Sequence, residues 1–150
     1  MNMIKKFSTV LAAFIISVCA MAQNIRISVD QLPDSALKLI DVAFPGDSIK
    51  NVRIEKRASL VQYEVHLAGK VKMQFSKDGK FTQCECSGKK SVPDILIPRK
   101  IREYLDREFK DRNVINLEHD SRLWEVILDN RVELDFNENC RLVDIDYDDD

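Results

Sequence analysis

Hydrophobic and polar residues alternate along several short stretches of the chain, which is the pattern of β-strands with one buried face. Residues 61–67 place four apolar side chains on one face and three polar ones on the other. The other alternating runs are 49–56, 71–75, 81–86, 114–119, 132–136 and 142–147. Turn-forming pairs such as Gly69-Lys70, Asp78-Gly79 and Asn130-Arg131 separate these runs, so the pattern predicts antiparallel hairpins.

Two further segments carry apolar residues spaced three and four apart, which predicts helices with one buried face. The shared apolar positions are Ala36, Leu39, Ile40 and Phe44 in the first segment, and Ile101, Tyr104, Leu105 and Phe109 in the second. Pro33 and Pro98 precede them, at the first helical turn, where a missing N–H costs nothing.

These elements occur twice in the same order. The strand 63–67 (Tyr-Glu-Val-His-Leu) recurs at 124–128 (Trp-Glu-Val-Ile-Leu), and the helices repeat with Phe44 matching Phe109. The offset between matching positions changes by four residues at 57–60, which predicts a longer loop there in the first copy. Agreement in order, spacing and residue class extends over about fifty residues and indicates an internal repeat.

The predicted fold class is therefore α+β, with two tandem repeats that each pack one helix on an antiparallel meander of three or four strands. Repeat one spans about 30–86 and repeat two about 92–147, and residues 25–29 add a short edge strand. The helix covers one face of each sheet and leaves the other open. The sequence leaves unresolved whether the two sheets are continuous, and whether the protein is a monomer or a dimer.

The first residues have the features of an export signal. Lys5 and Lys6 precede an apolar run at 7–18, and Ala20-Met21-Ala22 supplies the small residues that a signal peptidase requires before Gln23. The sequence thus predicts a signal peptide at 1–22 and a mature domain at 23–150, in the periplasm or secreted.

Two alternatives for this segment are disfavoured. A transmembrane helix needs roughly 20 apolar residues, and this run is shorter. A lipid anchor on Cys19 requires a small residue before it, where Val18 is branched. The prediction is a protein with no stable membrane anchor after cleavage.

Charge and cysteine content exclude several classes of function. Without Lys5 and Lys6 the chain keeps 21 basic and 25 acidic residues, a formal charge of −4, so it has no general attraction to nucleic acid or anionic lipid. The mature part keeps Cys84, Cys86 and Cys140, an odd number whose pairing stays open. No CxxC pair is present, so we predict neither a metal site nor a cofactor.

The residues at the helix ends, strands and turns of the repeats resemble those of a known family. Leu32-Pro33, the Phe-Pro-Gly at 44–46, the Tyr-Glu-Val-x-Leu at 63–67 and the Phe-x-x-Asp-Gly at 75–79 are similar to the PepSY-like, beta-lactamase-inhibitor-like group of exported bacterial proteins. The second copy resembles it too, with Lys110 and Cys140 at the positions of the proline and the turn glycine. The resemblance implies a tandem helix-plus-sheet fold and the binding or inhibition of other exported proteins, notably peptidases.

Catalytic constellations are missing from the sequence. The two histidines, His66 and His119, occupy non-equivalent repeat positions and have no partner motif. Glu64 and Glu125 match across the repeats on the predicted open face, where we expect both to be solvated, without the burial that general acid–base catalysis uses. No GxSxG, HExxH or phosphate-binding glycine loop occurs, so we predict no catalytic residues and a protein that is not an enzyme.

Two other features have simple interpretations. The acidic tail from Asp144 onward resembles the start of a calcium loop, but it lacks the glycine and the glutamate that complete one. Tyr63 and Trp124 lie at the same repeat position on the apolar strand face, which predicts core packing beneath each helix.

The sequence favours a binding or inhibitory module that acts through its open sheet face on another envelope or secreted protein. The predicted contact residues are the outward positions Gln62, Glu64, His66, Lys72, Gln74, Glu125, Ile127, Glu133 and Asp135. Ile127 is the one bulky apolar side chain among them and is the predicted anchor. The alternative is a carrier or sensor for a small molecule or metal, which predicts a ligand-sized cavity between the repeats.

We expect the chain recovered from the periplasm to begin at Gln23, because the small residues at 20 and 22 direct cleavage there. Intact-mass spectrometry of the recovered protein measures this directly. A mass that retains residues 1–22, or that carries a lipid on Cys19, would contradict the prediction.

Overall fold

The computed structural model describes residues 23–147; the predicted signal peptide at 1–22 and the last three residues lie outside the described part. The helices are α1 (Asp34–Ala43) and α2 (Arg99–Glu108), each preceded by a 3-10 turn at Val29–Gln31 or Asp94–Leu96. The strands of the first half are β1 (Gln23–Ile27), β2 (Ile49–Arg57), β3 (Leu60–Leu67), β4 (Val71–Ser76) and β5 (Phe81–Cys86). Those of the second half are β6 (Val114–His119), β7 (Leu123–Leu128), β8 (Glu133–Asn137) and β9 (Leu142–Asp146).

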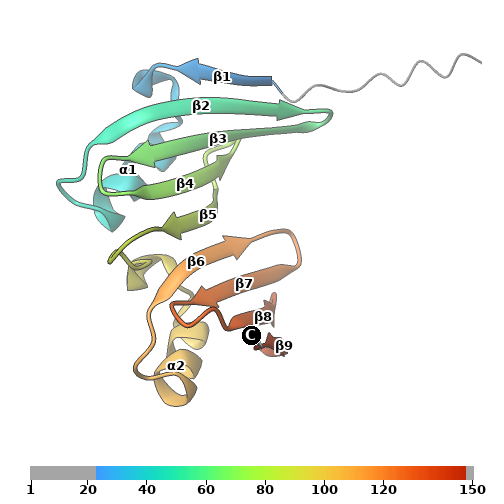
Figure 1. Cartoon of the computed structure of the whole chain (residues 1–150). Helices are drawn as coiled ribbons and strands as arrows, with labels where there is room; N and C mark the ends of the chain where they lie inside the picture. The colour runs from blue at the N-terminus through green and yellow to red at the C-terminus, as the bar shows by residue number, and fades with distance from the viewer. Residues whose placement is uncertain (1–22, 148–150) are drawn as a thin grey trace, which may run out of the picture.

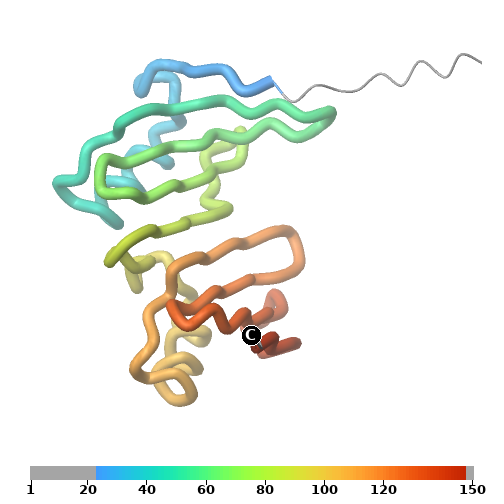
Figure 2. Tube along the Cα trace, in the orientation of Figure 1, coloured from blue at the N-terminus to red at the C-terminus, as the bar shows by residue number. Residues whose placement is uncertain are grey.

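All nine strands form one antiparallel sheet in the order of the chain, from β1 at one edge to β9 at the other (Figures 1 and 2). The α+β class is confirmed. The repeats do not have separate sheets, because β5 pairs with β6 through Gln83↔Glu118, Cys84↔Leu117 and Glu85↔Asn116. These three pairs are fewer than those between any other neighbouring strands. The expected edge strand at 25–29 is present as β1, which pairs with β2.

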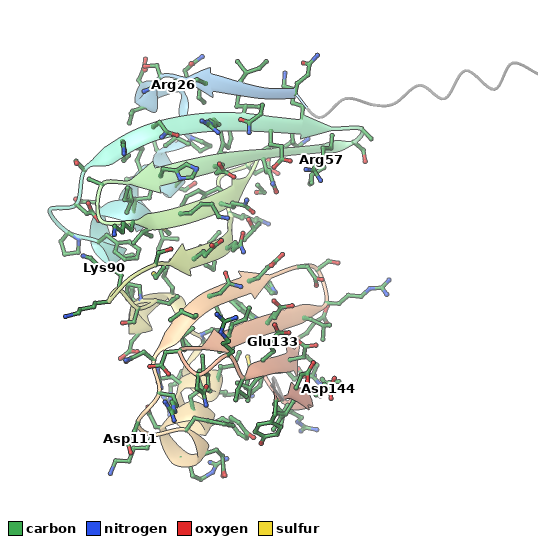
Figure 3. All side chains as sticks on the ribbon, in the orientation of Figure 1. Arg26, Arg57, Lys90, Asp111, Glu133 and Asp144 are labelled. Carbon is green, nitrogen blue, oxygen red and sulfur yellow. The ribbon has the colours of Figure 1, made fainter. Side chains whose placement is uncertain are left out.

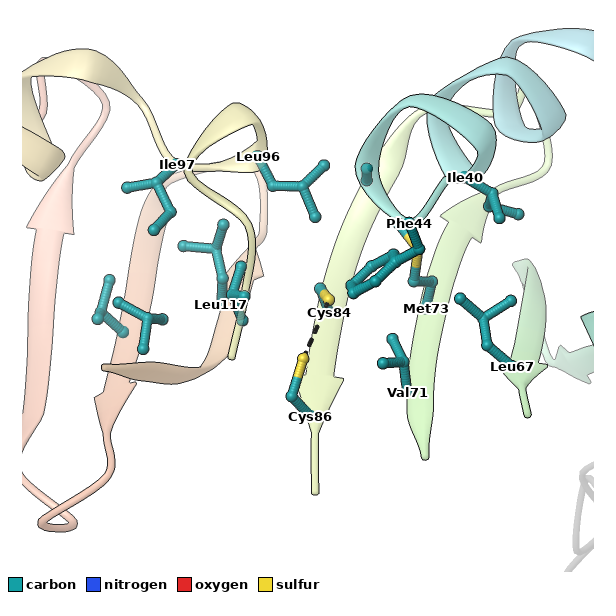
Figure 4. Packing of buried hydrophobic residues seen from close by; sticks show 14 of the residues in the cluster. Ile40, Phe44, Leu67, Val71, Met73, Cys84, Cys86, Leu96, Ile97 and Leu117 are labelled. Carbon is teal, nitrogen blue, oxygen red and sulfur yellow. Dashed lines mark hydrogen bonds between the residues drawn. The ribbon is translucent and has the colours of Figure 1, made fainter. Parts of the chain in front are cut away.

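A continuous row of apolar side chains crosses the sheet on the side that faces the helices. Successive cross-strand partners in this row are Ile27, Val52, Val65, Met73, Cys84, Leu117, Val126, Leu134 and Ile145. Buried residues of α1 and α2 belong to the same cluster, as Figure 4 shows for Ile40 and Phe44 above Leu67 and Met73. Both helices therefore cover one face of the sheet. No helix among residues 23–147 is long and apolar enough to span a membrane.

Matching turns keep the same backbone geometry where their residues differ. Gly79 has φ +80° and Cys140, at the equivalent position, has φ +59°, and each N–H bonds to the carbonyl three residues earlier at 2.8–2.9 Å. The helix ends agree as well: Phe44 N–H donates to the Ile40 carbonyl at 2.9 Å, and Phe109 N–H donates to that of Leu105 at 2.8 Å. The second helix therefore ends in the same way without the Pro-Gly pair of the first repeat.

We expected the four extra residues of the first repeat to lengthen a loop, but they do not. They extend the β2–β3 hairpin by paired residues as far as Arg57↔Leu60, whereas the matching β6–β7 ladder ends at His119↔Trp124. An even number of added residues keeps the alternation of faces, so the ladder continues in the same register.

Gly79→Ala is expected to destabilise the protein more than Gly88→Ala does. Both glycines have positive φ, +80° and +71°, so an added Cβ costs about 1–2 kcal/mol at either site. A Cβ at Gly79 would also meet the Ser35 hydroxyl and, at 2.7 Å, Cβ of Pro33, whereas the one at Gly88 meets nothing within 4 Å. The added crowding is expected to cost about 1–3 kcal/mol more, measured as the free energy of unfolding in urea. Equal losses for the two variants would contradict this contact of the turn with α1.

Candidate functional site

The face of the sheet opposite the helices, here called the open face, carries a second continuous row of cross-strand partners. This row consists of Arg26, Arg53, Glu64, Gln74, Gln83, Glu118, Glu125, Asp135 and Asp144. It begins with two arginines at the β1 edge and ends with four carboxylates at the β9 edge. Figure 3 shows Arg26 at one end of the sheet, and Glu133 and Asp144 at the other.

All nine predicted contact residues lie on the open face, in two separate groups. Gln62, Glu64, His66, Lys72 and Gln74 are on β3 and β4, whereas Glu125, Ile127, Glu133 and Asp135 are on β7 and β8. Strands β5 and β6 lie between the groups, which separates them by about 14 Å at the usual strand spacing. Whether either group contacts a partner stays a prediction.

Side chains of the first group bind one another. His66 Nε2 lies 2.6 Å from Glu64 Oε1, and Gln74 Nε2 donates to Glu64 Oε2 at 3.4 Å. In the next row Lys72 Nζ contacts Glu85 Oε2 at 2.5 Å. Desolvation raises the pKa of Glu64, but the hydrogen bond and charge of His66, with Gln74 and Lys72, outweigh it, so this pKa lies below its ordinary value.

The second half of the open face is acidic. Its six carboxylates are Glu118, Glu125, Glu133, Asp135, Asp144 and Asp146, on β6 to β9. None of the ion pairs within residues 23–147 includes any of these six. We call this set the acidic patch; two shallow hollows of about 100 and 80 Å³ lie over it.

Glu125 lies at the centre of the acidic patch, directly opposite Glu118 on one side and Asp135 on the other. Desolvation raises the pKa of Glu125 above its ordinary value, and the negative charges of Glu118, Asp135, Glu133 and Asp120 raise it further. The repeat-matched residues Glu64 and Glu125 therefore have pKa shifts of opposite sign.

Both glutamates lie on the open face but are less exposed than expected. Only 16% of the Glu64 side chain is exposed, and Glu125 is also partly buried, because neighbouring strands place long side chains on either side. Sequence reasoning also missed Arg26, Arg53 and Glu118 as members of the face. The alternation of polar and apolar residues in β2 and β6 indicated which side chains share a face. Placing that face beside the other strands required the strand pairing.

Aromatic and sulfur side chains lie mainly on the helix side. Tyr63 and Trp124 are partly buried and pack against the core, as predicted. Trp124 also stacks on its cross-strand partner His119, with ring centroids 4.0 Å apart. Cys84 and Cys86 share the core face as expected, with their Sγ atoms 3.9 Å apart and unbonded.

Neither the acidic patch nor the cysteines form a chelating cluster. Within the described chain, no group of three or more His, Cys, Asp or Glu side chains is arranged to hold a metal ion. Its hydrogen bond to Cys86 Sγ, together with burial, raises the pKa of the Cys84 thiol, so this thiol stays protonated in the core.

Glu125→Gln is expected to raise the free energy of unfolding at pH 7 by about 0.2–1 kcal/mol and to leave it unchanged at pH 3. A raised pKa means that the folded chain holds the proton more tightly than the unfolded chain. Stability is therefore lost as pH rises from the ordinary glutamate pKa through the raised one.

Glu64→Gln is the matched control for that variant. Its lowered pKa gives stability that is present above the ordinary value and lost as pH falls through the lowered one, so this variant is expected to be less stable at pH 7. Urea unfolding at pH 3, 5 and 7 compares the two. Changes of the same sign at pH 7 would overturn the contrast between the two halves.

Comparison with known proteins identifies relatives of this fold. A crystal structure from Bacteroides thetaiotaomicron, described as a "putative calcium-regulated periplasmic protein", has a TM-score of 0.79 and 32% identity over 82% of this chain and 96% of its own. A periplasmic protein from Bacteroides vulgatus has a TM-score of 0.79 and 28% identity, over 83% of this chain and 97% of its own. Another protein from the same organism, described as of unknown function, has a TM-score of 0.78 and 25% identity, over 83% of this chain and 99% of its own.

A search of curated proteins finds no match. A family model described as "Putative beta-lactamase-inhibitor-like, PepSY-like" matches the chain twice, at residues 19–83 and 61–144. The two matches agree with the internal repeat and together span most of the sequence. The chain belongs to the PepSY-like family.

Proposed function

We propose that this protein is an exported, periplasmic binding module that uses its open face to bind or inhibit another exported protein, such as a peptidase, without catalysis. The observation that carries the proposal is the acidic patch, a set of carboxylates without cationic partners among residues 23–147, on a face that the helices leave uncovered. The periplasmic descriptions of the structural relatives and the predicted signal peptide support the compartment.

The electrostatics of the acidic patch favour a cationic partner surface. Carboxylates directly opposite one another on neighbouring strands repel, and the raised pKa of Glu125 reflects this repulsion together with desolvation. Lysine or arginine side chains of a partner would relieve the repulsion and also accelerate encounter at low salt. The proposed partner therefore presents a basic surface to β6–β9.

Ile127 supplies an apolar contact within this polar surface. It lies between Asn116 and Glu133 in the row next to Glu125, and its side chain is partly buried. Interface anchors are commonly apolar side chains surrounded by polar groups that exclude water. Ile127 with the acidic patch around it has this arrangement.

Ile127→Asp is expected to abolish capture of the partner, because it adds a seventh carboxylate to the patch and removes the anchor. Immobilised mature protein is exposed to envelope extract, and bound proteins are identified by mass spectrometry. Val42→Asp is the control, since Val42 is 60% exposed on α1, on the helix side of the sheet. A partner retained by both variants, or lost by both, would refute binding through the open face.

The salt dependence of capture tests the charge argument separately. Binding through the acidic patch is expected to weaken strongly between 50 and 500 mM salt, because screening shortens the reach of charges to a few ångströms. A partner whose capture is unaffected by salt would remove the acidic patch from the proposal.

One structural relative is described as calcium-regulated. Within residues 23–147 of this chain no three His, Cys, Asp or Glu side chains are grouped to hold a metal ion. The calcium regulation of that relative is therefore not carried over to this protein.

A further inference from the structure

An open hollow of about 470 Å³ lies where the ends of β2, β3, β4 and β5 meet, at the margin of the open face. The carrier or sensor hypothesis predicted a ligand-sized cavity between the repeats, whereas this hollow lies within the first repeat. Its basic lining residues are Lys50, His66, Lys70 and Lys72, and Glu85 is its one acidic residue. The volume falls in the range of small-molecule sites.

The charge of the hollow is only partly compensated. Lys72 contacts Glu85 at 2.5 Å, and His66 contacts Glu64 at 2.6 Å. Lys50 and Lys70 take part in none of the ion pairs among the described residues. Two ammonium groups therefore border the hollow without an acidic partner from that part of the chain.

Three hydrogen bonds hold the backbone around the hollow. Ala68 N–H donates to the Ser48 carbonyl at 2.9 Å, and Ser87 N–H donates to the Lys70 carbonyl at 3.1 Å. Gly69 N–H donates to Asp47 Oδ1 at 3.1 Å. The turn that carries Lys70 is thus bonded to both neighbouring segments.

The second repeat has the same backbone at this place with fewer basic side chains: Lys70 corresponds to the basic residue Arg131, and both have positive φ. Asp129 N–H donates to the Asn113 carbonyl at 2.9 Å, as Ala68 does to Ser48. Lys50 and the matching Ile115 both lie at a register shift of their strands, and Lys72 corresponds to Glu133. The fold therefore does not require a basic residue at positions 50 and 72.

Asn51 gives a further contrast between the repeats. Its Oδ1 is buried and has no hydrogen-bond partner within residues 23–147, although the residue lines the hollow. The matching Asn116 accepts a hydrogen bond from Gln83 Nε2 at 3.0 Å. The unused group of Asn51 is an acceptor, so it can pair only with a hydrogen-bond donor.

We propose that this hollow binds a small anionic ligand that carries a carboxylate or a phosphate group. Lys50 and Lys70 supply the charge, and Lys72 can exchange Glu85 for the ligand. The proposal does not depend on a protein partner of the open face, because Lys50 and Lys70, which supply the charge, are outside the predicted contact set; His66 and Lys72 belong to both.

Inorganic phosphate and citrate are titrated separately into ¹⁵N-labelled mature protein, with the ionic strength held constant by sodium chloride. Saturable amide shifts are expected for residues 49–51, 66–72 and 85–87, with either or both probes. A response to phosphate alone or to citrate alone identifies the anionic group that the hollow recognises. No saturable shift with either probe would overturn the proposal.

The double variant Lys50→Gln, Lys70→Gln is expected to weaken binding about tenfold or more, because each lysine contributes a charge-assisted contact. The matched control is Lys100→Gln, Lys110→Gln, which removes the same charge from exposed positions in and after α2. Equal weakening in both double variants would indicate nonspecific attraction of anions and would overturn the site. Dispersed amide spectra of the variants establish that they are folded.

Discussion

One strand register across all nine strands is the constraint on which the rest of this structure depends. Because cross-strand partners lie on the same face, the apolar row from Ile27 to Ile145 fixes the neighbouring rows as outward. Both helices must then cover the same face, and the opposite face stays open. The weakest link of this register is the three-pair ladder between β5 and β6, where Cys84 and Leu117 join the two halves of the core.

The two repeats show which residues this constraint controls. Core positions keep their class, with Val65 matching Val126 and Met73 matching Leu134, because each must fill the space under a helix. Turn positions keep their backbone even where the residue changes, as Cys140 does at the place of Gly79. Open-face positions diverge in charge, and Lys72 against Glu133 is the sharpest case. Function is therefore to be sought where the repeats disagree.

The sequence predicts what depends on neighbours along the chain. Helix ends, strand alternation and the repeat all follow from local spacing, and the outward placement of residues such as Glu125 follows from alternation. The joining of β5 to β6 does not, because pairing two sheet edges is a long-range choice with no local signal. The opposite pKa shifts of Glu64 and Glu125 were out of reach for the same reason, since His66 faces one and Glu118 the other. The longer β2–β3 hairpin was read as a longer loop because a length difference alone does not tell paired residues from unpaired ones.

Charge separation along the open face decides how a partner could use it. Basic side chains gather around β1 to β4 and the hollow at their ends, while the acidic patch occupies β6 to β9. A partner with a single basic surface is attracted to one half and repelled from the other, so the separation fixes its orientation as well as its position. A small anion in the hollow would neutralise part of the basic half and lessen that repulsion. The two proposed sites are then coupled through the field of the sheet, with no movement of the backbone required.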